Sequence, residues 1–152
     1  GITQGFLPIA GFNFGAKKFD RVKKVIRVSF KYATILAVFI SILIFFLANQ
    51  IPRIFTSDEL INKEAPIALK IVFSLLPIVG IQLIGAAYFQ AIGKALPALL
   101  LTLTRQAFFF IPLVFLFSYK MGVLGVWISF PVSEFFATIV TVYYLNREMK
   151  KL

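Results

Sequence analysis

The sequence lacks cysteine and histidine, and only 6 of its 152 residues are Asp or Glu. Without these two residue types, disulfide frameworks, thiol nucleophiles, haem attachment and His/Cys zinc sites are excluded. Six acidic residues along the chain also leave little for a carboxylate metal cluster. We therefore expect no catalytic residue, no metal site and no resident cofactor, and the class of membrane-embedded enzyme is disfavoured.

Charged residues of both signs are scarce, at 14% of the chain, whereas apolar residues make up 60%. Soluble domains have roughly 25% charged and about 45–50% apolar residues, even with glycine counted among the latter. The mean hydropathy is +0.92. This composition excludes an ordinary water-soluble globule and predicts an all-α integral membrane protein.

The net charge is +10, from 16 Lys and Arg against 6 Asp and Glu. Nucleic-acid binding would place such charge along a folded polar surface. Here the basic residues stand at the edges of apolar segments, a pattern typical of membrane topology. We expect membrane lipid as a partner and no nucleic acid.

Uncharged runs locate the membrane-crossing segments. The runs 32–52 and 71–93 each meet the requirement of about 20 residues for a ~30 Å hydrocarbon core. In the last third, Arg105 and Glu134 each interrupt an otherwise apolar stretch. Turn signals at Gly93 and Gly122 favour two spans with one embedded charge each over four short segments. Four complete transmembrane helices are predicted, over 31–51, 67–92, 96–118 and 122–146.

The first 30 residues divide into two parts. Residues 1–16 carry no charge and resemble the end of a helix that begins before Gly1, so we interpret the chain as part of a longer protein. The basic segment 17–30 follows, and we expect a surface helix at about 18–27. Its cations can attract anionic lipid headgroups at about 1 kcal/mol each. The candidates for headgroup contact are Lys17, Lys18, Arg21 and Lys24.

Lys and Arg residues set the expected orientation, because they favour the cytoplasmic side. The basic segment 17–30, the turn at Lys94 and the C-terminal tail should lie inside. The connection 53–66, which holds three acids, and the turn at Lys120 should lie outside. These assignments alternate correctly, so we expect a multi-pass protein of the cell membrane with a cytoplasmic C-terminus.

A set of short motifs occurs in a familiar order. The main block runs from Gln4 to Lys17 and reads QGFLPIAGFNFGAK, followed by Arg21. The later matches are FQAIGK at 89–94, Arg105 seven residues before Pro112, GxxGVW at 122–127 and PVSE at 131–134. Together they resemble the MATE (multidrug and toxic compound extrusion) transporters over the whole chain.

The resemblance implies a twelve-helix, two-lobe antiporter that exports drugs or other organic compounds, often cationic, in exchange for Na⁺ or H⁺ by alternating access. Residues 1–16 would end helix eight, and the four spans would be helices nine to twelve of the C-terminal lobe. The partners would be a small organic substrate and the missing N-terminal lobe, without which we expect no transport. Some family members carry a coupling acid on helix ten, where residues 79–83 have none, so the coupling ion stays open.

Two alternatives to this function remain. One is a flippase for lipid-linked oligosaccharides from the same broad superfamily, which a more cationic central cavity would favour. The other is a non-transporting membrane subunit, which the length of the chain permits.

Arg105 and Glu134 are expected at similar depth. Arg105 lies about 8 residues, or ~12–13 Å, from the inner end of its span, and Glu134 lies ~12 Å from the inner edge of a ~30 Å core. We predict a buried ion pair, formed directly or through a polar neighbour such as Gln106. Two alternatives are a snorkelling Arg105 with an independent Glu134, and a role in a proton or cation path.

Further candidates complete the predicted site. Gln4, Gln82 and Glu134 are candidates for a substrate or cation pathway, although Gln82 is equally suited to binding a neighbouring helix. Each in-span proline removes a backbone hydrogen bond, so we predict helix kinks at Pro77, Pro112 and Pro131.

Overall fold

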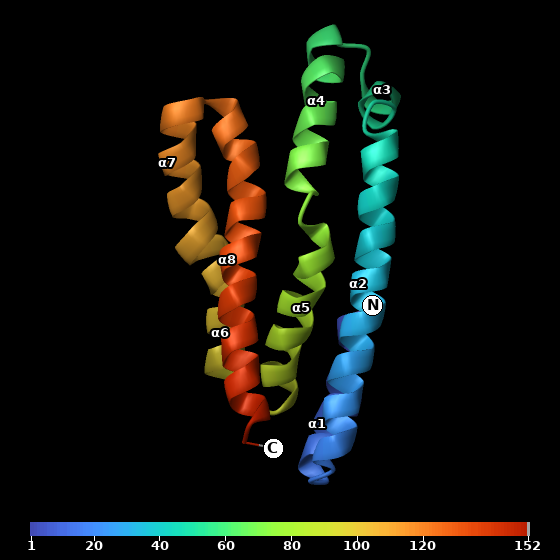
Figure 1. Cartoon of the computed structure of the whole chain (residues 1–152), viewed down its shortest axis with the longest axis vertical. Helices are drawn as coiled ribbons and strands as arrows, with labels where there is room; N and C mark the ends of the chain where they lie inside the picture. The colour runs from blue at the N-terminus through green and yellow to red at the C-terminus, as the bar shows by residue number, and fades with distance from the viewer. Residues whose placement is uncertain (152) are drawn as a thin grey trace.

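The computed structural model describes residues 1–151, and these residues form helices joined by turns, with no strand (Figure 1). The predicted all-helical fold is therefore confirmed. The helices are α1 (Ile2–Gly15), α2 (Phe19–Leu47), α3 (Ile51–Phe55), α4 (Glu59–Val72), α5 (Leu76–Ala91), α6 (Ala95–Leu103), the π-helix η1 (Thr104–Phe110), α7 (Ile111–Met121) and α8 (Val123–Met149).

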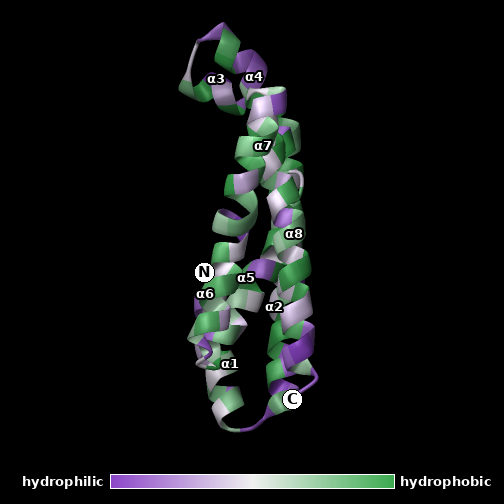
Figure 2. Ribbon diagram, turned by 90° about the vertical axis from the view of Figure 1, so that its left-hand side faces the viewer, coloured by the Kyte–Doolittle hydropathy of each residue, from purple (hydrophilic) through white to green (hydrophobic). Residues whose placement is uncertain are grey.

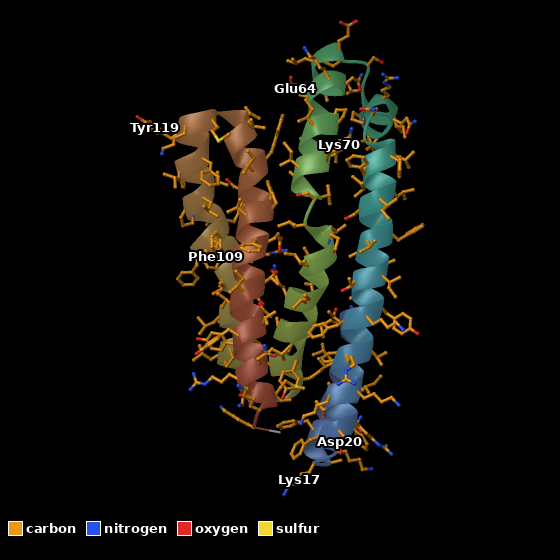
Figure 3. The ribbon with its side chains drawn as sticks, in the orientation of Figure 1. Lys17, Asp20, Glu64, Lys70, Phe109 and Tyr119 are labelled. Carbon is orange, nitrogen blue, oxygen red and sulfur yellow. The ribbon has the colours of Figure 1, made fainter. Side chains whose placement is uncertain are left out.

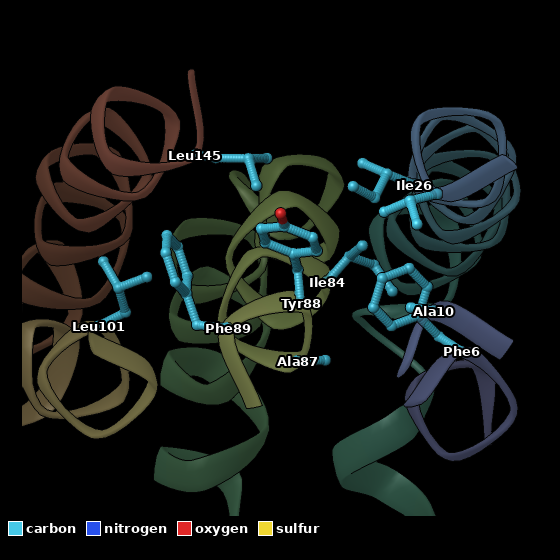
Figure 4. Packing of buried hydrophobic residues seen from close by; sticks show 10 residues of the cluster. Phe6, Ala10, Ile26, Ile84, Ala87, Tyr88, Phe89, Leu101 and Leu145 are labelled. Carbon is cyan, nitrogen blue, oxygen red and sulfur yellow. The ribbon is translucent and has the colours of Figure 1, made fainter. Parts of the chain in front are cut away.

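Helix α5 is the centre of the bundle and packs against α1, α2, α6 and α8. Its buried side chains Ile84, Tyr88 and Phe89 meet Phe6 of α1 and Leu145 of α8 (Figure 4). The α1–α2 turn and the C-terminus lie at one end of the molecule, whereas α3 and the α7–α8 turn lie at the other (Figure 1).

The outer surface of the bundle is apolar, as a lipid environment requires. Three helical stretches, Phe19–Leu47, Ala95–Met121 and Val123–Met149, are long and apolar enough to cross a membrane. The bent pair α4 and α5 makes a fourth if it is counted as one span. Hydrophilic residues gather toward the two ends (Figure 2), where Lys17 and Asp20 lie at one end and Glu64 and Tyr119 at the other (Figure 3).

The first two segments differ from the predicted boundaries. The basic residues 17–30 do not form a separate surface helix, because α2 continues without interruption from Phe19 to Leu47. The chain reverses between α1 and α2 over Ala16 to Lys18, where Lys17 has a φ of 56°. Basic residues have good helix propensity, so nothing in their sequence ends the helix at residue 30.

The helix predicted over 67–92 begins earlier and is divided. Helices α4 and α5 meet at 50° across residues 73–75. Pro77 has no backbone N–H and cannot bond the carbonyl four residues earlier. That carbonyl, on Phe73, instead accepts from the backbone N–H of Leu76 at 3.2 Å and from the Ser41 hydroxyl of α2 at 3.3 Å. The bend is thus tied to the neighbouring helix.

The other two in-span prolines behave differently from one another. Pro112 stands at the start of α7, directly after the π-helix η1. The wider turns of η1 interrupt the helix predicted over 96–118, a feature that often marks functional sites. Pro131 lies inside α8, which continues past it to Met149 without a break.

Helices α5 and α8 approach closely because Gly85 has no side chain. A Cβ built on Gly85 would lie 2.3 Å from Cγ2 of Thr141. Both residues are buried. The Thr141 hydroxyl donates to the carbonyl of Ala137 at 2.9 Å, so only its methyl group faces the glycine.

Gly85→Ala should therefore destabilise the protein by about 1–3 kcal/mol, the usual cost of overpacking. The double variant Gly85→Ala with Thr141→Ser should recover most of this loss, because serine keeps the hydroxyl and removes the methyl group. Thermal unfolding in detergent measures both effects. Gly15→Ala is the control, since its Cβ would meet no atom within 4 Å. Equal losses in the single and double variants would contradict this explanation.

Candidate functional site

The structure brings Arg105 and Glu134 together in the interior of the bundle. Nη1 of Arg105 donates to Oε1 of Glu134 at 3.0 Å. The side chains are 34% and 14% exposed, respectively. Arg105 comes from η1 and Glu134 from the middle of α8. The two charges embedded in the last two spans thus compensate each other directly.

The pair is direct and needs no polar neighbour such as Gln106 as a bridge, and Gln82 of α5 is the third member of this network. Its side chain is buried. The amide nitrogen Nε2 lies 2.7 Å from Oε2 of Glu134 and 2.8 Å from Oγ1 of Thr138. It also lies 2.8 Å from the backbone carbonyl of Glu134. We call Gln82, Arg105, Glu134 and Thr138 the carboxylate network.

A count of the donors explains this geometry. The Thr138 hydroxyl donates to the carbonyl of Glu134 at 2.7 Å, which leaves its oxygen free to accept. The two amide hydrogens of Gln82 then reach Thr138 and Oε2 of Glu134, while Arg105 reaches Oε1. Both carboxylate oxygens therefore accept from donors. An ionised carboxylate has only acceptors and suits this environment, whereas a protonated one adds an O–H donor.

Proton uptake by Glu134 would add an O–H donor to a carboxyl whose two oxygens both face donors, so Arg105 would have to shift or the amide of Gln82 would have to turn. The network joins α5, η1 and α8, so this displacement would loosen contacts among three segments. A cation near the carboxylate would compete with Arg105 in the same way. The arrangement can thus convert the charge state of one group into a change in helix packing.

A cavity of about 320 Å³ lies beside the network. It is bounded by the bend between α4 and α5, by η1 and by α8. Among its described lining residues, Arg105 and Glu134 are the two charged side chains, and they neutralise each other. The remaining walls are mostly apolar and come from Val72, Phe73, Leu76, Val79, Gln106, Phe110, Phe130 and Ser133.

The other predicted residues lie away from this network. Gln4 is exposed on α1 and bonds none of its members. The four headgroup candidates, Lys17, Lys18, Arg21 and Lys24, are all exposed at the end of the molecule where α1 turns into α2. The structure therefore brings together Gln82, Arg105 and Glu134 and leaves the remaining candidates apart.

A second ionic cluster was missed by the sequence reasoning. Glu148 pairs with Lys94 of the α5–α6 turn and, at 3.4 Å, with Lys151. Glu148 follows the uncharged part of α8, outside the predicted span. The hydrogen bond from Lys94 holds the pKa of this carboxyl below its ordinary value, against the opposing effect of burial. The predicted topology places Lys94 and the C-terminal tail on the same side of the membrane, and this is the sequence observation from which the pair could have been predicted.

Comparison with known proteins places the chain in a family. The sequence model of the MatE family matches residues 1–116. A curated relative, the multidrug export protein MepA of Staphylococcus aureus, is 27% identical over 150 residues, which cover 97% of this chain and 33% of MepA. The FAD transporter of Shewanella oneidensis is 23% identical over 146 residues, covering 96% of this chain and 32% of that protein.

Solved structures agree with this assignment. The MATE multidrug transporter DinF-BH is 35% identical, with a TM-score of 0.89, over 96% of this chain and 33% of that one. Inward-facing and outward-facing MATE transporters, 21% and 20% identical, both match the fold at a TM-score of 0.92 over 98% of this chain. The matched region is 35% and 34% of the length of these two transporters, respectively.

The chain belongs to the MATE family of multidrug efflux transporters. It spans about a third of the length of the relatives that it matches, at 33% of MepA. Its relatives are transporters rather than enzymes, in agreement with the composition.

Removing Arg105 should destabilise the protein more than removing both charges. Arg105→Met leaves the Glu134 carboxylate without its counter-ion; breaking a fully buried pair costs about 3–5 kcal/mol, so this pair, whose arginine is 34% exposed, should cost less. The double variant Arg105→Met with Glu134→Gln should regain much of this loss. Thermal unfolding of the purified variants gives the comparison, with the exposed Lys120→Met as a charge control. Additive losses would show that the two side chains act independently.

Tyr88→Phe should leave stability unchanged or raise it by about 1 kcal/mol, because an unsatisfied buried donor carries a desolvation penalty of that order. Tyr88 is 0% exposed, and its hydroxyl has no hydrogen-bond partner within the described residues. The phenylalanine keeps the ring that packs against Phe89 at 5.4 Å between centroids. A clear drop in the unfolding temperature would mean that the hydroxyl has a partner.

Proposed function

We propose that this chain forms most of the C-terminal lobe of a secondary antiporter that exports drugs or other organic compounds in exchange for Na⁺ or H⁺. The observation that carries the proposal is the carboxylate network, placed in the interior of a MATE-family fold. A multi-pass location in the cell membrane with a cytoplasmic C-terminus follows from the distribution of Lys and Arg. The missing N-terminal lobe would supply the rest of the pathway.

Alternating access would keep the overall fold of this lobe and change its packing locally, at the carboxylate network and at the Pro77 bend. The inward-facing and outward-facing structures match the chain at the same TM-score, 0.92, which supports a fold that is kept in both orientations. The carboxylate network can join the movement to ion binding, because proton or cation uptake at Glu134 removes a bond to η1 or to α5. The bend at Pro77 adjoins the same cavity and supplies a place where α4 can move relative to α5.

The charge of the cavity favours a neutral or cationic substrate. Arg105 is already paired with Glu134, so the described lining has no net charge to attract an anion. Phe110 and Phe130 present aromatic surface, which attracts cations by about 0.5–2 kcal/mol. The same argument disfavours an oligosaccharide flippase, whose lipid-linked pyrophosphate would need free positive charge. It also disfavours an anionic substrate such as FAD, which a relative is named for.

Dye transport by the full-length protein tests this function. Reconstituted into vesicles with its proposed N-terminal lobe, the parent protein should move a cationic dye against its gradient when a Na⁺ or H⁺ gradient is imposed. Glu134→Gln should slow this movement at least tenfold, because positioned groups that exchange protons commonly change rates by about a hundredfold or more. Lys120→Gln, an exposed position in the last turn of α7 and away from the carboxylate network, should transport like the parent.

The outcomes separate two levels of the proposal. A parent protein that moves no dye under either gradient would contradict the antiporter function. A parent protein that transports, together with a Glu134→Gln variant that transports equally well, would contradict only the coupling role of the carboxylate network.

A further inference from the structure

A second and larger cavity is a groove between α2 and α8, away from the carboxylate network. Its volume is about 620 Å³, within the range of roughly 300–1,000 Å³ that is usual for ligand sites. Ile81 of α5 contributes to its lining between the two outer helices. The apolar walls are formed by Phe30, Ile35, Ile81, Val142 and Leu145, and the polar lining by Lys31, Thr34 and Asn146.

The groove lies on the side of α5 opposite to α1 and α6. Figure 4 shows Leu145 of α8 and Ile26 of α2 on one side of α5, whereas Phe6 of α1 and Leu101 of α6 lie on the other. Within the described chain, helices α1 and α6 therefore do not cover the groove. The lining residues span about 6–8 Å along α2 and α8 at 1.5 Å per residue, so this apolar groove with its open side can hold the part of a hydrocarbon chain nearest its headgroup.

Its polar residues stand where both helices leave the apolar region. Lys31 is the last charged residue before the uncharged run of α2, and Asn146 is the last residue before Arg147 on α8. Both line the same groove, so its charged part lies at the level of lipid headgroups and its apolar part at the level of acyl chains.

The charge at this level is positive. Arg27 lies one helical turn before Lys31 on the same face of α2, and Lys150, the residue that caps the C-terminus of α8, lies four residues after Asn146. Asp20 is two further turns away from Arg27 on α2. The carboxylate at this end of α8, Glu148, is already paired with Lys94 and Lys151. The mouth of the groove is thus complementary to an anion.

We propose that the α2–α8 groove is a binding site for one anionic phospholipid. The phosphate lies at Lys31, with Arg27 adjacent, and an acyl chain follows Phe30, Ile35 and Val142 into the groove. This site differs from the general attraction of the exposed lysines at the α1–α2 turn, because it combines a cation with an apolar channel that fits the tail. It is independent of the proposed transport function.

Native mass spectrometry of the full-length protein, after equilibration with phosphatidylglycerol or phosphatidylcholine, tests this site. The parent should retain one phosphatidylglycerol in preference to phosphatidylcholine. Lys31→Gln should reduce its retention about fivefold, the contribution of one basic residue to anionic lipid binding. Ile81→Trp, which fills the groove without changing its charge, should reduce retention similarly.

Two matched controls make the result specific. Lys120→Gln removes one exposed charge from the last turn of α7, at the other end of the molecule, and Ile139→Trp enlarges an exposed residue of α8 that does not line the groove. Both should retain the lipid like the parent. Equal retention of the two lipids by the parent, an unchanged Lys31→Gln or Ile81→Trp variant, or an equal loss in the controls would each overturn the proposal. Unfolding temperatures without added lipid check that all variants are folded.

Discussion

A carboxylate inside an apolar helix bundle is stable only where donors surround it, because burial removes the water that would otherwise solvate its charge. Glu134 meets this condition through Arg105 on one oxygen and Gln82 on the other. Each donor comes from a different segment, so the position of α8 relative to α5 and η1 depends on this one charge.

Two irregular backbone segments adjoin this carboxylate. The π-helix carries Arg105, and at the break before α5 the carbonyl of Phe73 accepts from the N–H of Leu76 and from the hydroxyl of Ser41. A regular α-helix resists local rearrangement, because each residue is fixed by its own hydrogen bonds. The irregular turns border the cavity on two sides, so the parts of the backbone most easily rearranged lie next to the group whose charge can change.

The sequence was sufficient for the depth of the charges but not for their orientation. Counting residues from the ends of the spans placed Arg105 and Glu134 at one level, since the helical rise is constant. The rotation of a helix about its axis is set by packing, so residue counting did not predict that Gln82 of α5 would bond Glu134. Pro77 indicated a break because its missing N–H is a local property.

Other features depend on contacts that no local pattern encodes. The π-helix before Pro112 has no sequence signature that we recognised, and Pro131 is accommodated within an unbroken α8. The basic residues 17–30 continue into α2, since charge alone does not end a helix. The ion pair of Lys94 and Glu148 joins residues 54 positions apart. The sequence links them only through the predicted topology, which places both on the same side of the membrane.

Infrared difference spectroscopy is the most direct test of the central claim, that Glu134 is ionised while it accepts from both donors. Spectra of the parent protein and of Glu134→Gln would be compared near neutral pH. The account predicts that the substitution removes a carboxylate stretching band. Loss of the carbonyl band of a protonated carboxylic acid would contradict it, because the O–H of that acid would need an acceptor where the observed arrangement places the donors Arg105 and Gln82.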